Sequence, residues 1–162
     1  MNIQDIQKFD PQKMYQTYDN WHIHARDAFE KEFLKIHLQD IDHVALAGMG
    51  GSGAIGDVIS AILSREDIHV SNVKGYLLPK TVDERTLVIA TSISGNTKET
   101  ISILDYKSKS DAKFVAISSG GVMKEKCMKN SITHYDIPMI HSPRASFVTF
   151  LYSILNIFED VL

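Results

Sequence analysis

The spacing of hydrophobic residues changes near residue 40 of the chain. Up to about His37, apolar residues recur at steps of three and four, which predicts helix. Asp10 and Pro11 suit a helix entry, because proline is tolerated in a first turn. Farther along, short apolar runs replace the helical spacing. We therefore expect a helical segment over residues 1–40 and a second region over residues 41–162, which together form one domain.

The second region alternates short apolar runs with helical stretches. Strands are predicted at His43–Ala47, His69–Val73, Thr86–Ala90, Lys113–Ile117 and Thr133–Ile137. Helices are predicted at Ser52–Arg65, Asn96–Lys107, Val122–Lys129 and Arg144–Leu162. Continuous apolar runs are typical of strands that are buried on both faces, and a repeated strand, loop and helix predicts a parallel sheet. The expected fold class is α/β: a doubly wound, three-layer sheet of the flavodoxin type.

The first loop between a strand and a helix is rich in glycine. Gly48, Gly50 and Gly53 form a literal G-x-G-x-x-G, which is typical of dinucleotide-binding folds. The loop is either a backbone cradle for a phosphate or a tight turn that needs glycine for its φ angles. A dinucleotide site also requires an acidic residue at the end of the second strand, and residues 70–76 contain neither Asp nor Glu. The sequence therefore favours a phosphate cradle over a dinucleotide site.

The second loop carries five hydroxyl side chains within ten residues. Ser92, Ser94 and Thr97 can donate O–H bonds to anionic oxygens, beside the positive end of the following helix. Helix capping by Ser94 or Asn96, with Glu99 in a capping box, is the alternative, and it accounts for one hydroxyl. Neutral donors without a phosphate-binding lysine indicate a monophosphate site that needs neither a metal nor another cofactor.

Three loop sequences together resemble the SIS (sugar isomerase) domain family. The residues that carry this resemblance are Gly50–Ser52, Ser92–Thr100 and Ile117–Gly121. Two further stretches are similar to one branch, the bifunctional phosphoglucose/phosphomannose isomerases: Gly48–Gly56 and Pro143–Ser146. The resemblance covers Val44 to Ser146 and concerns the N-terminal half of these isomerases, whose subunit contains two SIS domains.

The resemblance implies a hexose 6-phosphate ligand and a metal-free isomerisation of glucose or mannose 6-phosphate to fructose 6-phosphate through an enediolate. The residues that it assigns to the phosphate are Ser92, Ser94, Thr97, Gly51 and Ser52, with Gly50, Gly95, Asn96 and Thr100 as secondary candidates. It assigns Arg144 to the enediolate, where a fixed guanidinium stabilises the developing negative charge. A surface salt bridge is the alternative role for this arginine.

The family's general base belongs to the second half, which this chain lacks, and none of the seven histidines matches the family's histidine. A phosphosugar sensor without catalysis is therefore an alternative function, and a dinucleotide-binding domain is a weaker one. Three positions depart from the usual family pattern: Asp57, Ile93 and Phe147. None of them is a proposed donor.

Composition limits the remaining partners. The net charge is −3, so no broad basic face for nucleic acid or an acidic membrane is expected. A single cysteine, Cys127, and a start without an apolar leader indicate the cytoplasm. Lysines near Cys127 could lower its pKa, although no nucleophile motif surrounds it. An apolar stripe along the last helix, from Phe147 to Val161, predicts a homodimer or pairing with a second SIS domain.

Overall fold

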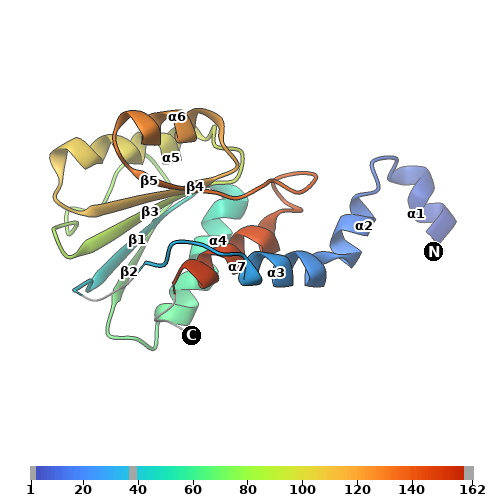
Figure 1. The fold of residues 1–162 in the computed structure, drawn as a ribbon, viewed down its shortest axis with the longest axis horizontal. Coiled ribbons are helices and arrows are strands. Elements are labelled where there is room, and N and C mark those ends of the chain that lie inside the picture. Colours follow the sequence, from blue (N-terminus) through green and yellow to red (C-terminus); the bar gives the residue numbers. More distant parts are fainter. Residues whose placement is uncertain (1–2, 37–39, 159–162) are drawn as a thin grey trace.

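A five-stranded sheet of parallel strands forms the centre of the molecule, with the order β2-β1-β3-β4-β5 (Figure 1). The structure, a computed structural model, describes residues 3–36 and 40–158. Its strands are β1 His43–Ala47, β2 His69–Val73, β3 Thr86–Ser92, β4 Lys113–Ser118 and β5 Thr133–Asp136. This strand order belongs to the flavodoxin-like class of doubly wound sheets, so the predicted fold class is confirmed.

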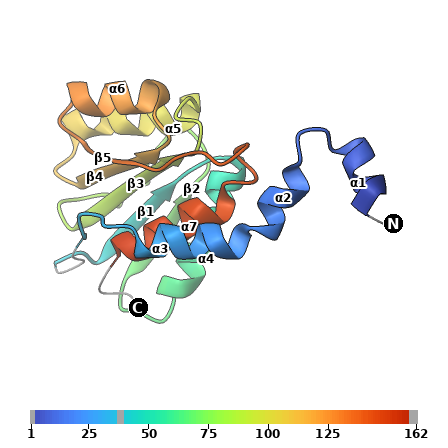
Figure 2. The same cartoon turned by 45° about the vertical axis from the view of Figure 1, so that its right-hand side comes forward.

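Helices cover both faces of the sheet and extend from it at the N-terminal end (Figures 1 and 2). They are α1 Ile3–Phe9, α2 Met14–Asp19, α3 Trp21–Glu30, α4 Gly50–Leu63, α5 Lys98–Ile103, α6 Gly121–Lys129 and α7 Phe147–Ile157, and α5 continues as the 3-10 helix η1 Leu104–Lys109. The helices α4 and α7 pack on one face, and α5, η1 and α6 pack on the other. The helix α3 lies along α7 (Figure 2).

The interior strand β1 shows why its sequence is an unbroken apolar run. All five of its residues are buried, because helices cover both faces. Val44 and Leu46 belong to the core under α4 and α7, whereas Ala45 and Ala47 belong to the core under α5 and α6. The period of two between the faces follows from the pleat of a strand. Both β1 and β2 have the predicted bounds.

The N-terminal region is helical, but it is not one continuous helix to His37. It breaks at Asp10 and Pro11, where a carboxylate oxygen of Asp10 accepts a hydrogen bond from the N–H of Tyr15 at 2.8 Å. This bond satisfies a free N–H in the first turn of α2. The third helix ends at Glu30, because Lys31 has an extended backbone. His37 lies outside the described residues.

Other helix ends also differ from the prediction: α4 spans Gly50–Leu63 rather than Ser52–Arg65, and α6 begins at Gly121 rather than at Val122. The helix predicted from Asn96 begins at Lys98 and tightens into 3-10 geometry at Leu104. The last helix begins at Phe147 rather than at Arg144, because the preceding residues form a turn. Tertiary contacts shift helix ends in this way without changing which elements exist.

The apolar stripe of α7 is largely covered by the chain itself. Phe150, Ile154 and Ile157 are fully buried, and Leu151 and Leu155 are partly buried against the same core. The helix α3 packs along α7 and contributes a contact between the rings of Phe29 and Tyr152 at 6.4 Å. The apolar stripe, whose width predicts a partner, therefore packs partly against α3 of the same chain. Val161 lies outside the described residues.

Candidate functional site

The sheet topology creates a crevice where β1 and β3 end side by side. The chain leaves β1 for α4 on one face and leaves β3 for α5 on the opposite face. Neighbouring strands whose connections diverge in this way form a switch point, and ligands of doubly wound sheets bind there. The glycine-rich first loop and the hydroxyl-rich second loop meet at this point.

The second loop folds around its own hydroxyl groups. Ser92 donates from its Oγ to the Oγ1 of Thr97 at 3.0 Å, and the N–H of Thr97 points back to the Oγ of Ser92 at 3.4 Å. Ser94 Oγ accepts from the N–H of Asn96 at 3.3 Å. Ser92 is buried, whereas Ser94 and Thr97 are half-buried. The hydroxyls of Ser94 and Thr97 are therefore the more accessible members of the loop.

The first loop is joined to the second by one buried hydroxyl. Ser52 Oγ accepts a hydrogen bond from the N–H of Ile93 at 3.4 Å. Gly50 has a φ of +54°, and it begins α4 together with Gly51 at the surface. Gly48 approaches the turn closely, because a Cβ there would lie 2.9 Å from the carbonyl carbon of Ser52. The loop thus needs its glycines for the turn, whether or not a ligand binds.

A third loop, which follows β4, completes the crevice wall. Gly95 has a φ of +70°, and a Cβ on it would lie 1.9 Å from the carbonyl oxygen of Gly120. Ser119 Oγ donates to the carbonyl of Ile93 at 2.7 Å, and Asn96 Oδ1 accepts from the N–H of Val122 at 3.2 Å. Ser119 is absent from the predicted phosphate-binding residues. Its position in the Ser-Ser-Gly-Gly run after β4 was the signal that could have indicated it.

The alternative, in which Ser94 or Asn96 caps α5, is not seen in the described part of the chain: the N-cap residue of α5 is Thr97, and its side chain makes no cap hydrogen bond, as is also true of Met49 at α4. The N–H of Ser52 is bonded to the carbonyl of Met49 at 3.1 Å, so at the start of α4 the N–H groups of Gly50 and Gly51 are the ones that can face an anionic ligand. Thr100, a secondary candidate, is buried in α5, and its hydroxyl has no hydrogen-bond partner among the residues described.

Charged groups near the crevice are paired with one another rather than with the hydroxyl cluster. The negative charge of Glu99 lies near Tyr76 and raises the pKa of that phenol. Asp57 on α4 accepts from Lys74 at 2.7 Å and from Asn72 at 3.2 Å. The end of β2 therefore presents an amide and an ammonium group where a dinucleotide fold requires a carboxylate.

Arg144 is at the same end of the sheet, in the turn that precedes α7. The segment between β5 and α7 crosses the carboxyl ends of the strands (Figure 2). Arg144 is exposed, and in residues 3–36 and 40–158 its guanidinium has neither a hydrogen bond nor an ion pair. The alternative role in a salt bridge is thus not seen within these residues. No described contact joins the guanidinium to the hydroxyl cluster.

The other polar candidates have structural roles. Cys127 is buried in α6, and burial raises the pKa of its thiol to about 11, which outweighs the opposite effect of Lys126. The predicted lowering of its pKa is therefore wrong. His134 Nε2 lies 2.7 Å from Ser118 Oγ and supports the third loop, and burial lowers the pKa of this imidazole.

No group of three or more His, Cys, Asp or Glu side chains in the described ranges has the geometry to hold a metal ion. None of the helices that the structure describes is both long and apolar enough to span a membrane.

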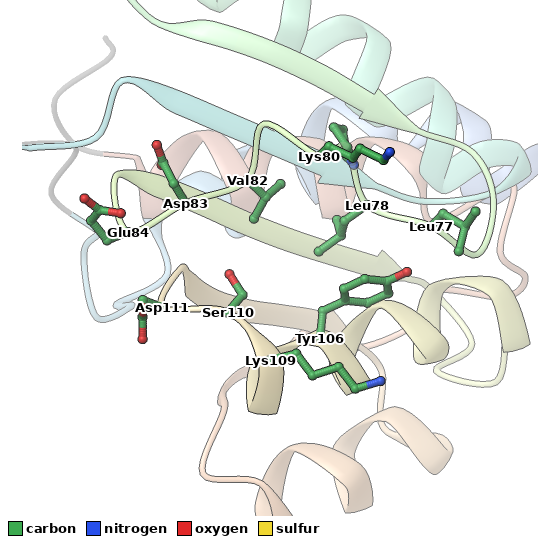
Figure 3. A pocket seen from close by; sticks show the side chains of 11 residues that line it. Leu77, Leu78, Lys80, Val82, Asp83, Glu84, Tyr106, Lys109, Ser110 and Asp111 are labelled. Carbon is green, nitrogen blue, oxygen red and sulfur yellow. The ribbon is translucent and has the colours of Figure 1, made fainter.

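The most prominent cavities lie away from the hydroxyl cluster. One cavity of about 540 Å³ lies between the segment that connects β2 to β3 and the helix η1 (Figure 3). Leu78 and Lys80 line it on one side and Tyr106 on the other. The hydroxyl cluster lies instead at the switch point of the sheet, where Ser94 and Thr97 are half-buried and can reach a small polar ligand.

Comparisons with known proteins agree with this architecture. A family model described as SIS domain matches residues 37–155. The bifunctional phosphoglucose/phosphomannose isomerase of Caldicellulosiruptor bescii is 39% identical over 114 residues, which are 70% of this chain and 34% of that protein. The D-glucosamine-6-phosphate 4-epimerase of Sulfolobus acidocaldarius is 29% identical over 147 residues, which are 88% of this chain and 46% of that protein.

Solved structures show the same fold at low sequence identity. The C-terminal domain of glucosamine-fructose-6-phosphate aminotransferase from Francisella tularensis superposes with a TM-score of 0.66 at 15% identity, covering 88% of this chain and 46% of that chain. The chain spans about a third to a half of the length of the two relatives described above. The match of the family model over most of the sequence shows that this chain belongs to the SIS domain family.

Proposed function

We propose that the chain binds a hexose 6-phosphate as part of a glucose-6-phosphate/mannose-6-phosphate isomerase. The observation that carries the proposal is the convergence of three loops at the switch point of the sheet. Ser52 joins the first loop to the second at Ile93, and Gly95 packs against Gly120 of the third loop. Together they form a fixed crevice whose donors are hydroxyl and backbone N–H groups, which suits a phosphate monoester.

The phosphate is expected to lie over the second loop. Ser94 and Thr97 donate to its oxygens from the accessible side, whereas Ser92 and Ser52 orient the loop and line its base. Gly51 allows the ligand to approach the backbone at the start of α4. Because these donors are neutral, they stay in the same protonation state over the physiological pH range.

Arg144 is proposed to stabilise the enediolate of the isomerisation. A base removes the proton from C2 of the open-chain aldose, and the resulting enediolate carries negative charge on O1. A proton then passes from O2 to O1, and the base returns the first proton to C1, which leaves the carbonyl at C2. A guanidinium beside O1 lowers the barrier. The base has to come from outside the hydroxyl cluster, whose hydrogen-bond partners are hydroxyl and backbone groups. A second SIS domain, or a second copy of this chain, is the proposed source, with the cytoplasm as the proposed location.

The relatives support the ligand class more strongly than the reaction. One relative is named for phosphoglucose and phosphomannose, and the other for glucosamine 6-phosphate. Both names specify a six-carbon sugar that carries a phosphate, but one protein is an isomerase and the other a 4-epimerase. The relatives thus agree on a phosphorylated hexose and differ in the bond that is changed.

A phosphosugar sensor is the second candidate function. The observation in its favour is that the carboxylates nearest the crevice, Glu99 and Asp57, are already engaged with Tyr76 and Lys74. A site made only of neutral donors holds its ligand without changing it. The two candidates share the ligand and differ in turnover.

Calorimetric titration of the chain with fructose 6-phosphate, inorganic phosphate and NAD tests the proposal. We expect fructose 6-phosphate to bind more tightly than inorganic phosphate and NAD to give no heat. Binding of NAD without binding of the sugar phosphate would contradict the proposal. A coupled isomerase assay then separates the two functions: turnover that Arg144→Ala abolishes supports the isomerase, and binding without turnover supports a sensor or an incomplete half.

A further inference from the structure

The turn that carries Arg144 is closed from within by Ser146. This serine is fully buried, and its Oγ accepts a hydrogen bond from the N–H of Ile140 at 2.8 Å. The same hydroxyl lies 2.8 Å from the carbonyl of Ser142 and can donate to it. These bonds join the two ends of the turn on either side of Arg144, so the backbone of the arginine has a defined position.

The N-terminal helices hold the same turn from outside. Trp21, the first residue of α3, donates from its indole Nε1 to the carbonyl of Ala145 at 2.8 Å, across 124 positions of sequence. Tyr18 packs its ring against the indole at 4.8 Å with an interplanar angle of 75°, which orients the donor. On the other side of Arg144, the Nε2 of His141 lies 3.2 Å from the carbonyl of Gln12.

The segment between β5 and α7 is not closely packed on the side that faces α3 and α7. A cavity of about 200 Å³ lies between α3, α7 and the chain after β5, and Pro138 and Ile140 form part of its wall. Thr149 Oγ1 also lines the cavity, where it is buried and has no hydrogen-bond partner among the described residues. Because a cavity lies beside part of this segment, its position depends on the hydrogen bonds at its ends.

We propose that Trp21 is a positioning residue for Arg144, so that the N-terminal helical region forms part of the functional site. The family model matches residues 37–155, and Gln12, in the loop before α2, and Trp21, in α3, lie outside that match although both contact the segment that carries Arg144. The inference rests on the proposed role of Arg144 at the enediolate. The proposal gives the N-terminal region the function of positioning Arg144, which the loops of the sheet do not supply.

Two variants on the same helix separate positioning from stability. Trp21→Phe keeps an aromatic ring against Tyr18 and removes the indole N–H, whereas Phe29→Leu weakens the packing of α3 on α7 without touching the Arg144 turn. The ligands are fructose 6-phosphate and 5-phospho-D-arabinonate, whose carboxylate carries the charge that an enediolate develops. Calorimetry on the 162-residue chain gives both affinities for each variant.

A positioning role predicts a selective loss of affinity for the charged analogue. We expect Trp21→Phe to weaken its binding roughly tenfold, about what the loss of one hydrogen bond to a charged group costs, and to change fructose 6-phosphate binding less than about twofold. The double variant with Arg144→Ala should bind like Arg144→Ala alone, since the two residues act through one contact. Phe29→Leu should leave the ratio of the two affinities unchanged.

The contrary outcomes are distinct. If the wild-type chain binds both ligands and Trp21→Phe behaves like Phe29→Leu, the positioning role is wrong while the proposed function stands. If the wild-type chain binds neither ligand, the proposed function fails. Hydrogen exchange of residues 138–146 then tests Trp21 by itself: faster exchange in Trp21→Phe alone supports its hold on the turn, and equal exchange in both variants overturns it.

Discussion

At the carboxyl ends of β1, β3 and β4 the side chains are small and neutral, whereas the amino ends of β1, β2 and β3 carry imidazoles, carboxylates and a guanidinium. His43 is buried there, with its Nε2 2.9 Å from Ser71 Oγ and its Nδ1 3.3 Å from Thr86 Oγ1. Thr86 donates to a carboxylate oxygen of Asp83 at 3.0 Å. A cavity of about 790 Å³ opens beside these groups.

The difference between the two ends follows from the direction of the strands. Helix N-termini gather at the carboxyl end, where their free N–H groups favour an anion, and neutral hydroxyls add donors without a competing charge. The amino end has no such field, and its polar groups satisfy one another. Ser92 and Thr86 are both buried hydroxyls on β3, yet one orients a ligand loop and the other anchors a polar network. The role of a buried hydroxyl thus depends on the end of the sheet at which it lies.

The largest expected effect is that of Gly95→Ala, which should disrupt the loops at the carboxyl ends of the strands. A Cβ would lie 1.9 Å from the carbonyl oxygen of Gly120, in a backbone with a φ of +70°. We expect the free energy of unfolding to fall by roughly 3 kcal/mol or more, because neither backbone can move without opening the loops. Thermal unfolding measures the loss, and fructose 6-phosphate should no longer shift the midpoint.

Gly75→Ala is the matched control for this substitution. Nothing lies within 4 Å of a Cβ at Gly75, and its φ is not positive. Its stability should change by no more than about 0.5 kcal/mol. Equal destabilisation by the two substitutions would show that the close approach of Gly95 to Gly120 is not what holds the crevice together.

A pair of threonine substitutions separates the two ends directly. Thr97→Val should weaken fructose 6-phosphate binding by roughly tenfold, because one donor to the phosphate is lost, and should lower stability by about 1–3 kcal/mol, because buried Ser92 loses its acceptor. Thr86→Val should lower stability by about 1–3 kcal/mol, because Asp83 and His43 lose a buried partner, and leave binding intact. Calorimetry and denaturant unfolding of both variants check this. If Thr86→Val lost ligand binding and kept full stability, the proposed difference between the two ends of the sheet would be wrong.

Much of the fold was accessible from the sequence because the strands are buried on both faces. A mostly apolar run such as His43–Ala47 fits a strand that is buried on both faces. The run itself therefore determines the type of this element and where it begins and ends. The helix ends were less accessible. Arg144 and Phe147 belong to a turn and a helix because Ser146 bonds to Ile140 and Ser142, which is a tertiary outcome.

The same distinction applies to the candidate site. Ser92, Ser94 and Thr97 could be proposed from the sequence, because each follows directly from the end of one strand. The bond between Ser52 and Ile93, and the contact of Gly95 with Gly120, join loops from different strands and depend on strand order. Trp21 gave no local signal at all, since its partner Ala145 is 124 positions away.

The smallest expected effect is a dependence of stability on pH that originates at the amino end. Burial, followed by the nearby charge of His69, lowers the pKa of His43 below its ordinary value of 6.5. The unfolded chain then binds a proton more readily than the folded chain. His43 should therefore contribute stability that is present above about pH 6.5 and decreases as the pH falls toward its lower folded-state pKa.

His43→Gln keeps a neutral polar side chain and should reduce this loss of stability between neutral and mildly acidic pH, as measured by urea unfolding at several pH values. Part of the slope should remain, because burial also lowers the pKa of His134. The exposed His22→Gln is the control for replacing a histidine by glutamine at the surface. Fructose 6-phosphate affinity should be equal in His43→Gln and the wild-type chain at neutral pH, since the crevice at the carboxyl end has neutral donors. An altered affinity would mean that the two ends of the sheet are coupled through β1 and β3.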